Sequence, residues 1–189
     1  KATSLNDAGF VDLGLRVKWA ADNVGGNPGF RYAWGEIASK ELNNWVMYKW
    51  KKANEMRLIK YSIDKNVGQV DGLTTLQPED DAATNFYQSP RYRMPTKEEF
   101  EELIQQCKWN FTKRDGVDGY EVSRNGKSIF LPAAINKHGN PAHAYWSSTL
   151  NTENCWEAYL LVRPNSEDTS PKISSYERAY AFYIRAVRK

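Results

Sequence analysis

Apolar and polar residues alternate along the first part of the chain. Across residues 11–20 the odd-numbered positions are apolar or aromatic, so they share one face in the period-two pattern of a half-buried strand. Residues 23–29 form a turn cluster of glycine, asparagine and proline, and residues 30–36 are typical of a short strand. Residues 40–62 are rich in aromatic side chains but follow neither period, which indicates short strands or an ordered aromatic loop.

The helical period appears after Pro95. Thr96 is a favourable N-cap residue and Glu99 follows it at the spacing of a capping box. The apolar stripe that continues from this start consists of Phe100, Leu103, Ile104 and Cys107. A shorter helix is predicted over residues 78–84, with proline in its first position. Carboxylates crowd the start of both helices, where the helix dipole favours negative charge.

Beyond the longer helix the pattern returns to strands and tight turns. Asn125-Gly126 lies between residues 120–123 and 127–131, which predicts a hairpin with a type I′ turn. Asp115-Gly116 and Asp118-Gly119 are interpreted as turn pairs. Further strands are expected over residues 144–150, 156–163 and 180–188. Strands, then helices, then strands favour an α+β fold with an antiparallel sheet.

Composition favours one soluble domain covering residues 1–189. The chain has 26 Lys and Arg against 23 Asp and Glu, and this scattered net charge of +3 does not indicate a nucleic-acid partner. No apolar run approaches the ~20 residues of a membrane span. The chain begins at Lys1 without Met, so we expect a fragment of a longer, processed protein. Aromatic residues make up 13% of the chain, which suits a β-rich core and a binding surface.

The candidate chemical groups do not form a catalytic pattern. The helix carboxylates are neighbours on one surface, whereas glycosidases need two carboxyl groups across a cleft. His138 and His143 lie in a loop near Ser147 and Ser148, but no G-x-S-x-G motif surrounds either serine. We therefore predict no catalytic residues and no enzyme activity.

Metal and cofactor sites are not indicated either. Neither histidine has a His or Cys partner four residues away, so a zinc site is not expected. Residues 77–80, Gln-Pro-Glu-Asp, superficially resemble a proline-containing calcium loop, which leaves calcium as the one alternative. Cys107 and Cys155 are too few for a disulfide framework and are expected to be separate thiols, although their spacing does not decide whether they pair.

Tyrosine and arginine gather in the late strands and the loops between them. Both residue types dominate binding hot spots, because they bury large areas with few rotors and offer hydrogen bonds. The alternative is that several of them are ordinary strand residues. The candidate ligand contacts are Tyr145, Glu157, Tyr159, Arg163, Tyr176, Arg178 and Tyr180.

Several motifs occur in a characteristic order between about residues 10 and 188. They are V-D-L-G-L with V-K-W-A (11–20), A-W-G-E (33–36), L-Q-P-E-D-D-A-A (76–83), R-M-P-T-K-E-E-F (93–100), S-I-F-L-P-A-A (128–134), Y-W-S-S (145–148) and F-Y-I-R (182–185). This set resembles the major paralogous domain family (FISUMP) of secreted and surface bacterial proteins. That family is similar in turn to the formylglycine-generating-enzyme branch of the C-type lectin-like fold. The tail departs from the family pattern G-F-x-V-R-P-V, because it reads A-F-Y-I-R-A-V here.

The resemblance implies a C-type lectin-like fold of the α+β class, with two helices packed on antiparallel sheets and with paired N- and C-terminal strands. It also implies a secreted or lipid-anchored surface protein, or a periplasmic one, which meets a membrane only through an anchor outside this fragment. Arg93 and Arg185 match signature positions and are expected to be buried ion-pair partners of the helix carboxylates.

The function expected from this resemblance is non-catalytic adhesion, in which the late strands and their loops bind a glycan or a surface protein. One alternative is an oxidase of the formylglycine-generating type. That activity uses a redox cysteine pair with copper, and Cys107 lies instead on the core stripe of the predicted helix. The other alternative is a structural subunit of a surface fibre.

Overall fold

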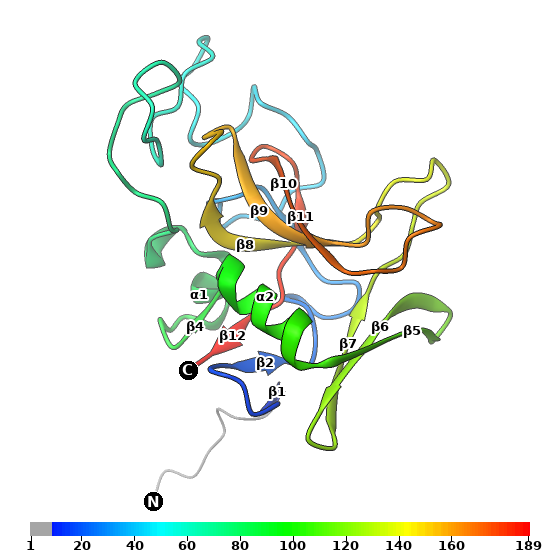
Figure 1. Ribbon diagram of the computed structural model, residues 1–189. Helices are drawn as coiled ribbons and strands as arrows, with labels where there is room; N and C mark the ends of the chain where they lie inside the picture. The colour runs from blue at the N-terminus through cyan, green and yellow to red at the C-terminus, as the bar shows by residue number, and fades with distance from the viewer. Residues whose placement is uncertain (1–8) are drawn as a thin grey trace, which may run out of the picture.

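A computed structural model describes residues 9–189, and it is mostly β with two short α-helices (Figure 1). The strands are β1 (Phe10–Val11), β2 (Lys18–Ala20), β3 (Arg31–Tyr32), β4 (Tyr92–Arg93), β5 (Lys108–Arg114), β6 (Val117–Arg124), β7 (Lys127–Pro132), β8 (Ala144–Leu150), β9 (Glu157–Val162), β10 (Lys172–Glu177), β11 (Phe182–Tyr183) and β12 (Val187–Arg188). The helices are α1 (Ala82–Tyr87) and α2 (Lys97–Gln106), and a 3₁₀ turn covers Pro78–Asp80. The first eight residues of the expected domain lie outside the described part.

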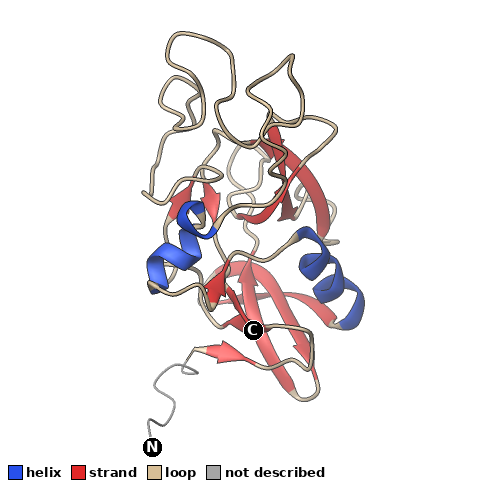
Figure 2. Cartoon of the chain, turned by 90° about the vertical axis from the view of Figure 1, so that its left-hand side faces the viewer, coloured by secondary structure: helices blue, strands red, loops and turns tan. Residues whose placement is uncertain are grey.

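The strands form three sheets, in the orders β1-β2-β12-β4, β10-β9-β8-β11-β3 and β5-β6-β7. The pairs are antiparallel, except that β11 runs parallel to β8. In the first sheet the C-terminal strand β12 lies between β2 and β4, with Val187 opposite Trp19 on one side and Arg93 on the other. The expected pairing of N- and C-terminal strands is therefore confirmed. Figure 2 shows the two helices on opposite flanks of the strands.

Helix α2 begins where the sequence predicts. The Thr96 side chain accepts a hydrogen bond from the Glu99 backbone N–H, and a Glu99 carboxylate oxygen accepts one from the Thr96 N–H at 2.9 Å, so the capping box is confirmed. Phe100 and Leu103 are buried. Cys107 falls just after the helix in an extended conformation, because the chain turns there directly into β5.

The shorter predicted helix is divided into two parts. Pro78 starts the 3₁₀ turn, and Asp81 then takes an extended conformation and caps α1 through a hydrogen bond from the Thr84 N–H. Helix α1 consequently starts later than predicted and continues to Tyr87. It ends at Gln88, whose φ of 53° is in the left-handed region.

The hairpin between β6 and β7 is confirmed. Asn125 and Gly126 both have positive φ, 54° and 73°, as a type I′ turn requires. Asp115-Gly116 forms a second turn of this kind, between β5 and β6, with φ of 50° and 80°. The interpretation of Asp118-Gly119 as a turn was wrong, because both residues pair within β6.

Two other strand predictions are corrected. Residues 11–20 do not form one strand: β1 and β2 pair with each other, and the chain reverses between them through Gly14, which has a φ of 74°. Leu13, Val17 and Trp19 are nevertheless buried, as the alternating pattern predicts. The strand expected over residues 180–188 is broken into β11 and β12, which belong to different sheets.

Buried side chains gather in two clusters, which are joined by β8 and β9. Trp146 of β8 and Leu160 of β9 belong to a cluster around Trp34. Their neighbours Tyr145 and Leu161 belong to a cluster with Trp19, Phe100 and residues of β6 and β7. Alternation along these strands therefore sends successive side chains to opposite sides of one sheet.

Residues 37–76 contain no regular strand or helix but are well ordered by specific contacts. Leu58 makes isolated β-bridges to Lys51 and Gly68, and Thr75 makes one to Thr149 of β8. The Leu58 and Tyr61 side chains are fully buried. Of the two sequence-based interpretations of residues 40–62, the ordered aromatic loop is confirmed.

Candidate ligand-binding surface

Three of the predicted contact residues are part of the protein interior. Arg178 is fully buried, and its guanidinium donates to the backbone oxygens of Lys60, Tyr61 and Cys155 and to the Tyr48 hydroxyl, at 2.9 to 3.1 Å. It also lies over the Trp34 ring, 4.8 Å from its centroid. This arginine holds residues 37–76 against the β-sheet and presents no group to solvent.

Tyr145 and Arg163 are buried in the same way. The Tyr145 hydroxyl donates to the Pro132 carbonyl oxygen at 2.7 Å, and burial raises its pKa to about 12. Arg163 donates to the carbonyl oxygens of Ala133 and Ser166 and lies over the Phe111 ring. Neither residue belongs to an exposed surface: Tyr145 is an ordinary residue of β8, and Arg163 directly follows β9.

Glu157 and Tyr159 lie on the face of β9 that is turned toward α2. Lys97 of α2 is 4.5 Å above the Tyr159 ring. A chain of hydrogen bonds links the Tyr159 hydroxyl to Asn151, Asn151 to Ser175, and Ser175 to the Glu157 carboxylate. The polar groups of this face are thus already partnered by one another.

Tyr176 and Tyr180 lie apart from those residues, beside Phe182. Tyr176 is opposite Ala158 in the β9–β10 pair, so its side chain leaves the sheet on the face opposite to Tyr159. The Tyr176 ring is 4.9 Å from the Tyr180 ring and 5.4 Å from the Phe182 ring, edge to face in both cases. Phe182 rests in turn on the buried Trp146 at 5.0 Å. We call Tyr176, Tyr180 and Phe182 the aromatic edge.

The aromatic edge is partly exposed, and the hydroxyl groups of its two tyrosines are available to a ligand. Tyr176 is 44% exposed, while Tyr180 and Phe182 are half-buried. Within residues 9–189 no protein group hydrogen-bonds the Tyr176 or the Tyr180 hydroxyl, whereas those of Tyr145 and Tyr159 are bonded. Partial burial raises the pKa of Tyr176, so its hydroxyl stays a neutral donor and acceptor at ordinary pH.

Neighbouring residues support this edge, and sequence reasoning did not select them. Asn43, from the aromatic loop, accepts a hydrogen bond from the Ala181 N–H at 2.6 Å and fixes the turn between Tyr180 and Phe182. Phe182 stood in the quoted F-Y-I-R motif but was not named as a contact, because its role depends on a strand pairing that no local pattern reveals.

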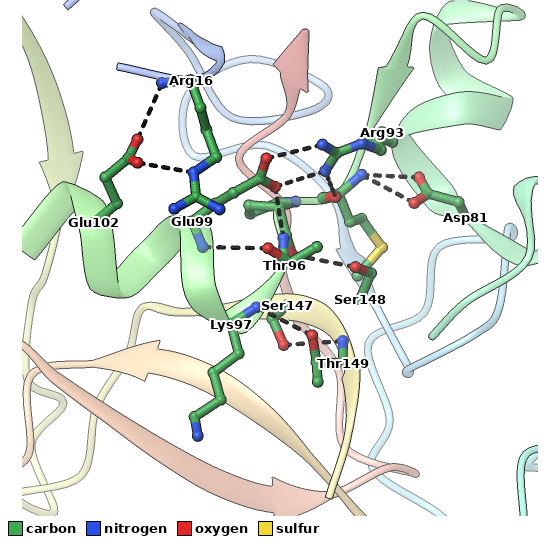
Figure 3. A network of polar contacts seen from close by, with 12 residues as sticks. Arg16, Asp81, Arg93, Thr96, Lys97, Glu99, Glu102, Ser147, Ser148 and Thr149 are labelled. Atoms are coloured by element: carbon green, nitrogen blue, oxygen red, sulfur yellow. Dashed lines mark hydrogen bonds and ion pairs between the residues drawn. The ribbon is translucent and has the colours of Figure 1, made fainter. Parts of the chain in front are cut away.

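The carboxylates at the helix starts are structural. Figure 3 shows the Arg93 guanidinium facing Glu99, with bonds of 2.6 and 2.8 Å to its two oxygens. This pairing and the capping bonds hold the pKa of Glu99 below its usual value despite burial. Asp81 accepts from the Met94 N–H with both oxygens, and burial raises its pKa. The expected ion pair of Arg93 is therefore confirmed.

Arg185 does not pair with a carboxylate as expected. It is fully buried and donates to Asn23 Oδ1 and to the carbonyl oxygens of Ala20, Ala21 and Phe130, at 2.8 to 3.1 Å. Burial lowers its pKa. It lies beside a polar cavity of about 260 Å³ between residues 21–27, the end of β5 and β7. Because its donors are directed to protein oxygens, Arg185 braces this region.

The remaining candidate groups are separate from one another. Cys107 and Cys155 are free thiols; Cys155 is buried in the Trp34 cluster, and Cys107 packs against the other cluster. Asp80, in the loop that resembled a calcium site, accepts from Lys60 Nζ at 2.6 Å and from the Tyr61 hydroxyl at 2.5 Å. No group of three or more His, Cys, Asp or Glu side chains suited to a metal occurs within residues 9–189.

Comparisons with known proteins give no family. No protein-family model, no curated protein and no solved structure matches the chain. Among the described residues, no helix is long and apolar enough to cross a membrane.

Proposed function

We propose that this chain is a non-catalytic binding module of C-type lectin-like fold on a cell surface or in a secreted protein, and that its aromatic edge contacts a glycan or a surface protein. The resemblance of its motifs to the FISUMP family supports the fold and the location. The paired terminal strands and the two helices beside antiparallel sheets are consistent with that fold.

One observation carries the binding proposal: two tyrosine hydroxyls without protein partners stand on rings that pack against each other at an exposed sheet edge. A sugar ring presents an apolar C–H face and a rim of hydroxyls. An aromatic ring covers the first, and a free tyrosine hydroxyl bonds to the second. The Tyr176 ring is fixed by Tyr180 and Phe182, so little side-chain entropy is lost on binding.

The surroundings favour binding over catalysis. The buried arginines Arg178 and Arg185 and the helix carboxylate Glu99 are bonded to protein groups. Recognition by the two tyrosines needs no proton transfer and no cofactor.

The test is a glycan-array screen of the purified chain, run with calcium and again with a chelator. We expect selective binding that falls roughly tenfold or more in Tyr176→Ala and Tyr180→Ala, the loss of a central aromatic contact. Tyr159→Ala is the matched comparison on the opposite face and should bind as the wild type does. Equal loss in all three variants would contradict the aromatic edge as the contact.

Other outcomes identify the alternatives. Loss of binding with the chelator would add a calcium site. Copper-dependent oxygen consumption that disappears in Cys155→Ser would establish the oxidase. Polymers formed through the edge strand β10, whose outer side has no strand partner within residues 9–189, would establish the fibre subunit.

A further inference from the structure

Most of the large apolar side chains that the described chain leaves exposed lie in residues 42–70, which we call the distal segment. Leu42, Val46 and Met47 are 74%, 80% and 72% exposed. The whole set within this segment is Leu42, Val46, Met47, Met56, Ile59, Ile63 and Val70, and only Phe30, Phe86 and Tyr176 are exposed in this way elsewhere in residues 9–189. Scattered exposed apolar residues need no explanation, but such a concentration marks an interaction surface.

The distal segment is also the positively charged part of the molecule. It contains six Lys or Arg residues and two acidic ones, a net charge of +4, while the whole chain has +3. Lys60 is engaged by Asp80, and Lys51 donates to backbone oxygens within the segment. The other four cations, Lys49, Lys52, Arg57 and Lys65, are exposed, and of these Lys52 pairs with Glu55 at 2.7 Å and Lys49 lies 3.9 Å from Asp80.

The segment occupies one end of the molecule. Figures 1 and 2 both show these loops projecting at the end opposite β1, well beyond the sheets. A flat partner therefore reaches the distal segment without touching the hairpin of β1 and β2.

The apolar side chains are held outward by a fixed backbone. Leu58 and Tyr61 are fully buried and Tyr48 is nearly so, while Ile59, Ile63 and Met47, one or two positions away, are exposed. The Asp71 carboxylate accepts hydrogen bonds from the N–H groups of Tyr61, Ser62 and Leu73. Because Arg178 also binds the Lys60 and Tyr61 carbonyls, these loops cannot turn their apolar side chains inward without breaking buried hydrogen bonds.

We propose that the distal segment binds the surface of an anionic lipid bilayer, with its apolar side chains at the boundary of headgroups and acyl chains and its lysines at the lipid phosphates. An acidic polysaccharide supplies negative charge but no apolar layer for Leu42, Val46 and Met47, whereas an anionic bilayer supplies both. The distal segment adjoins the aromatic edge through the hydrogen bond from the Ala181 N–H to Asn43, but the proposed bilayer contact uses other side chains. It adds a direct membrane contact to the expected anchor outside the fragment.

The experiment is vesicle flotation with the full 189-residue chain, using phosphatidylcholine vesicles with and without 30% phosphatidylglycerol. We expect binding to the anionic vesicles only, weakening as salt screens the charge. The charge variant Lys52→Glu/Lys65→Glu should bind roughly tenfold or more weakly. Its matched control is Lys127→Glu/Lys137→Glu, which makes the same change in net charge at exposed sites outside the distal segment and should bind as the wild type does.

The apolar part is tested separately by Val46→Ser/Met47→Ser, which should also lose binding by roughly tenfold, because insertion scales with buried apolar area. Near-UV circular dichroism checks that each variant is folded. Three results would overturn the proposal: equal binding to neutral vesicles, equal loss in the control charge variant, or binding to a polyanion such as heparin that Val46→Ser/Met47→Ser leaves unchanged. A concentration-dependent dimer abolished by the same apolar variant, without vesicle binding, would assign the surface to a second copy instead.

Discussion

Single residues in this protein show how burial decides the role of a polar side chain. Arg178 and Tyr176 are two residues apart, and both residue types are common in binding sites. Tyr176 is 44% exposed with a free hydroxyl, whereas every bond of Arg178 goes to protein oxygens. Residue type alone cannot separate the two, so the sequence selected both.

His143 is the residue whose burial has a consequence for pH. Its Nδ1 accepts a hydrogen bond from the Ala134 N–H, and its ring stacks on Tyr183. Burial, with the charge of Arg31 as a smaller cause, lowers its pKa from 6.5 to about 4. The unfolded chain therefore takes up a proton as pH falls through about 6.5, while the folded protein does so only near 4. Stability must fall across this window as the pH drops.

We predict that His143→Gln flattens this dependence, because glutamine can accept the same hydrogen bond but does not titrate. The measurement is the melting temperature of wild type and variant at pH 7 and pH 4.5. The melting temperature of the wild type should fall by more between these two pH values than that of the variant. The exposed His138 provides the control, since His138→Gln should follow the wild type. An identical loss in His143→Gln and the wild type would show that His143 is protonated in the folded state.

At the scale of elements, the start of α2 combines a capping box with an ion pair on one carboxylate. Glu99 accepts from the Thr96 N–H and from Arg93, and its side chain is only 4% exposed. The two roles can be separated, because glutamine keeps a cap acceptor but carries no charge.

We predict a graded loss of stability at this position. Glu99→Ala should cost roughly 2–3 kcal/mol, because it removes the cap and leaves the half-buried Arg93 unpaired. Glu99→Gln should cost about half as much, and Thr96→Ala about 1 kcal/mol. Urea unfolding measures each difference. The exposed neighbour Glu98 gives the control, since Glu98→Ala should change stability by less than about 0.5 kcal/mol. Equal costs for the alanine and glutamine variants would mean that the cap acceptor adds nothing beyond the charge, and a glutamine variant as stable as the wild type would mean that the charge contributes nothing.

Elements with local signals were predictable from the sequence. The capping box depends on bonds between Thr96 and Glu99, and the Asn125-Gly126 turn depends on the positive φ of two adjacent residues, so both are recognisable within a few positions. Strand β10 was missed as an element because it lies at a sheet edge and alternates exposed with half-buried residues, so it lacks an apolar face. The break between β11 and β12 depends on partners in two sheets, which no local window contains.

The candidate site was predictable only in part, for the same reason. Tyr176 and Tyr180 were selected by residue type, but their contact with Phe182 requires the crossing from β10 to β11. The distal segment was recognisable as aromatic and aperiodic. Its exposed apolar side chains become evident only once Leu58 and Tyr61 are known to be buried.

At the scale of the whole molecule, residues 184–187 contribute side chains to both buried clusters. Ile184 and Ala186 belong to the Trp34 cluster, while Val187 belongs to the Trp19 cluster. Strand β12 also joins β2 to β4. Since β8 and β9 contribute side chains to both clusters as well, neither cluster can lose its packing alone.

We therefore predict that the chain unfolds in one cooperative transition, and that Val187→Ala weakens both clusters together. Deleting part of this fully buried side chain should lower the free energy of unfolding by roughly 2 kcal/mol, because β12 is paired on both sides and cannot move to fill the cavity. Hydrogen exchange measures the effect: protection should fall by the same factor at buried amides around Trp19 and around Trp34, as expected for one cooperative unit. The control variant is Val117→Ala, at a half-buried position at the start of β6. It should lower hydrogen-exchange protection less, and only near β6. If protection fell around Trp19 and Phe100 but persisted around Trp34 and Trp146, the two clusters would be independent units, and β8 and β9 would link them without coupling them.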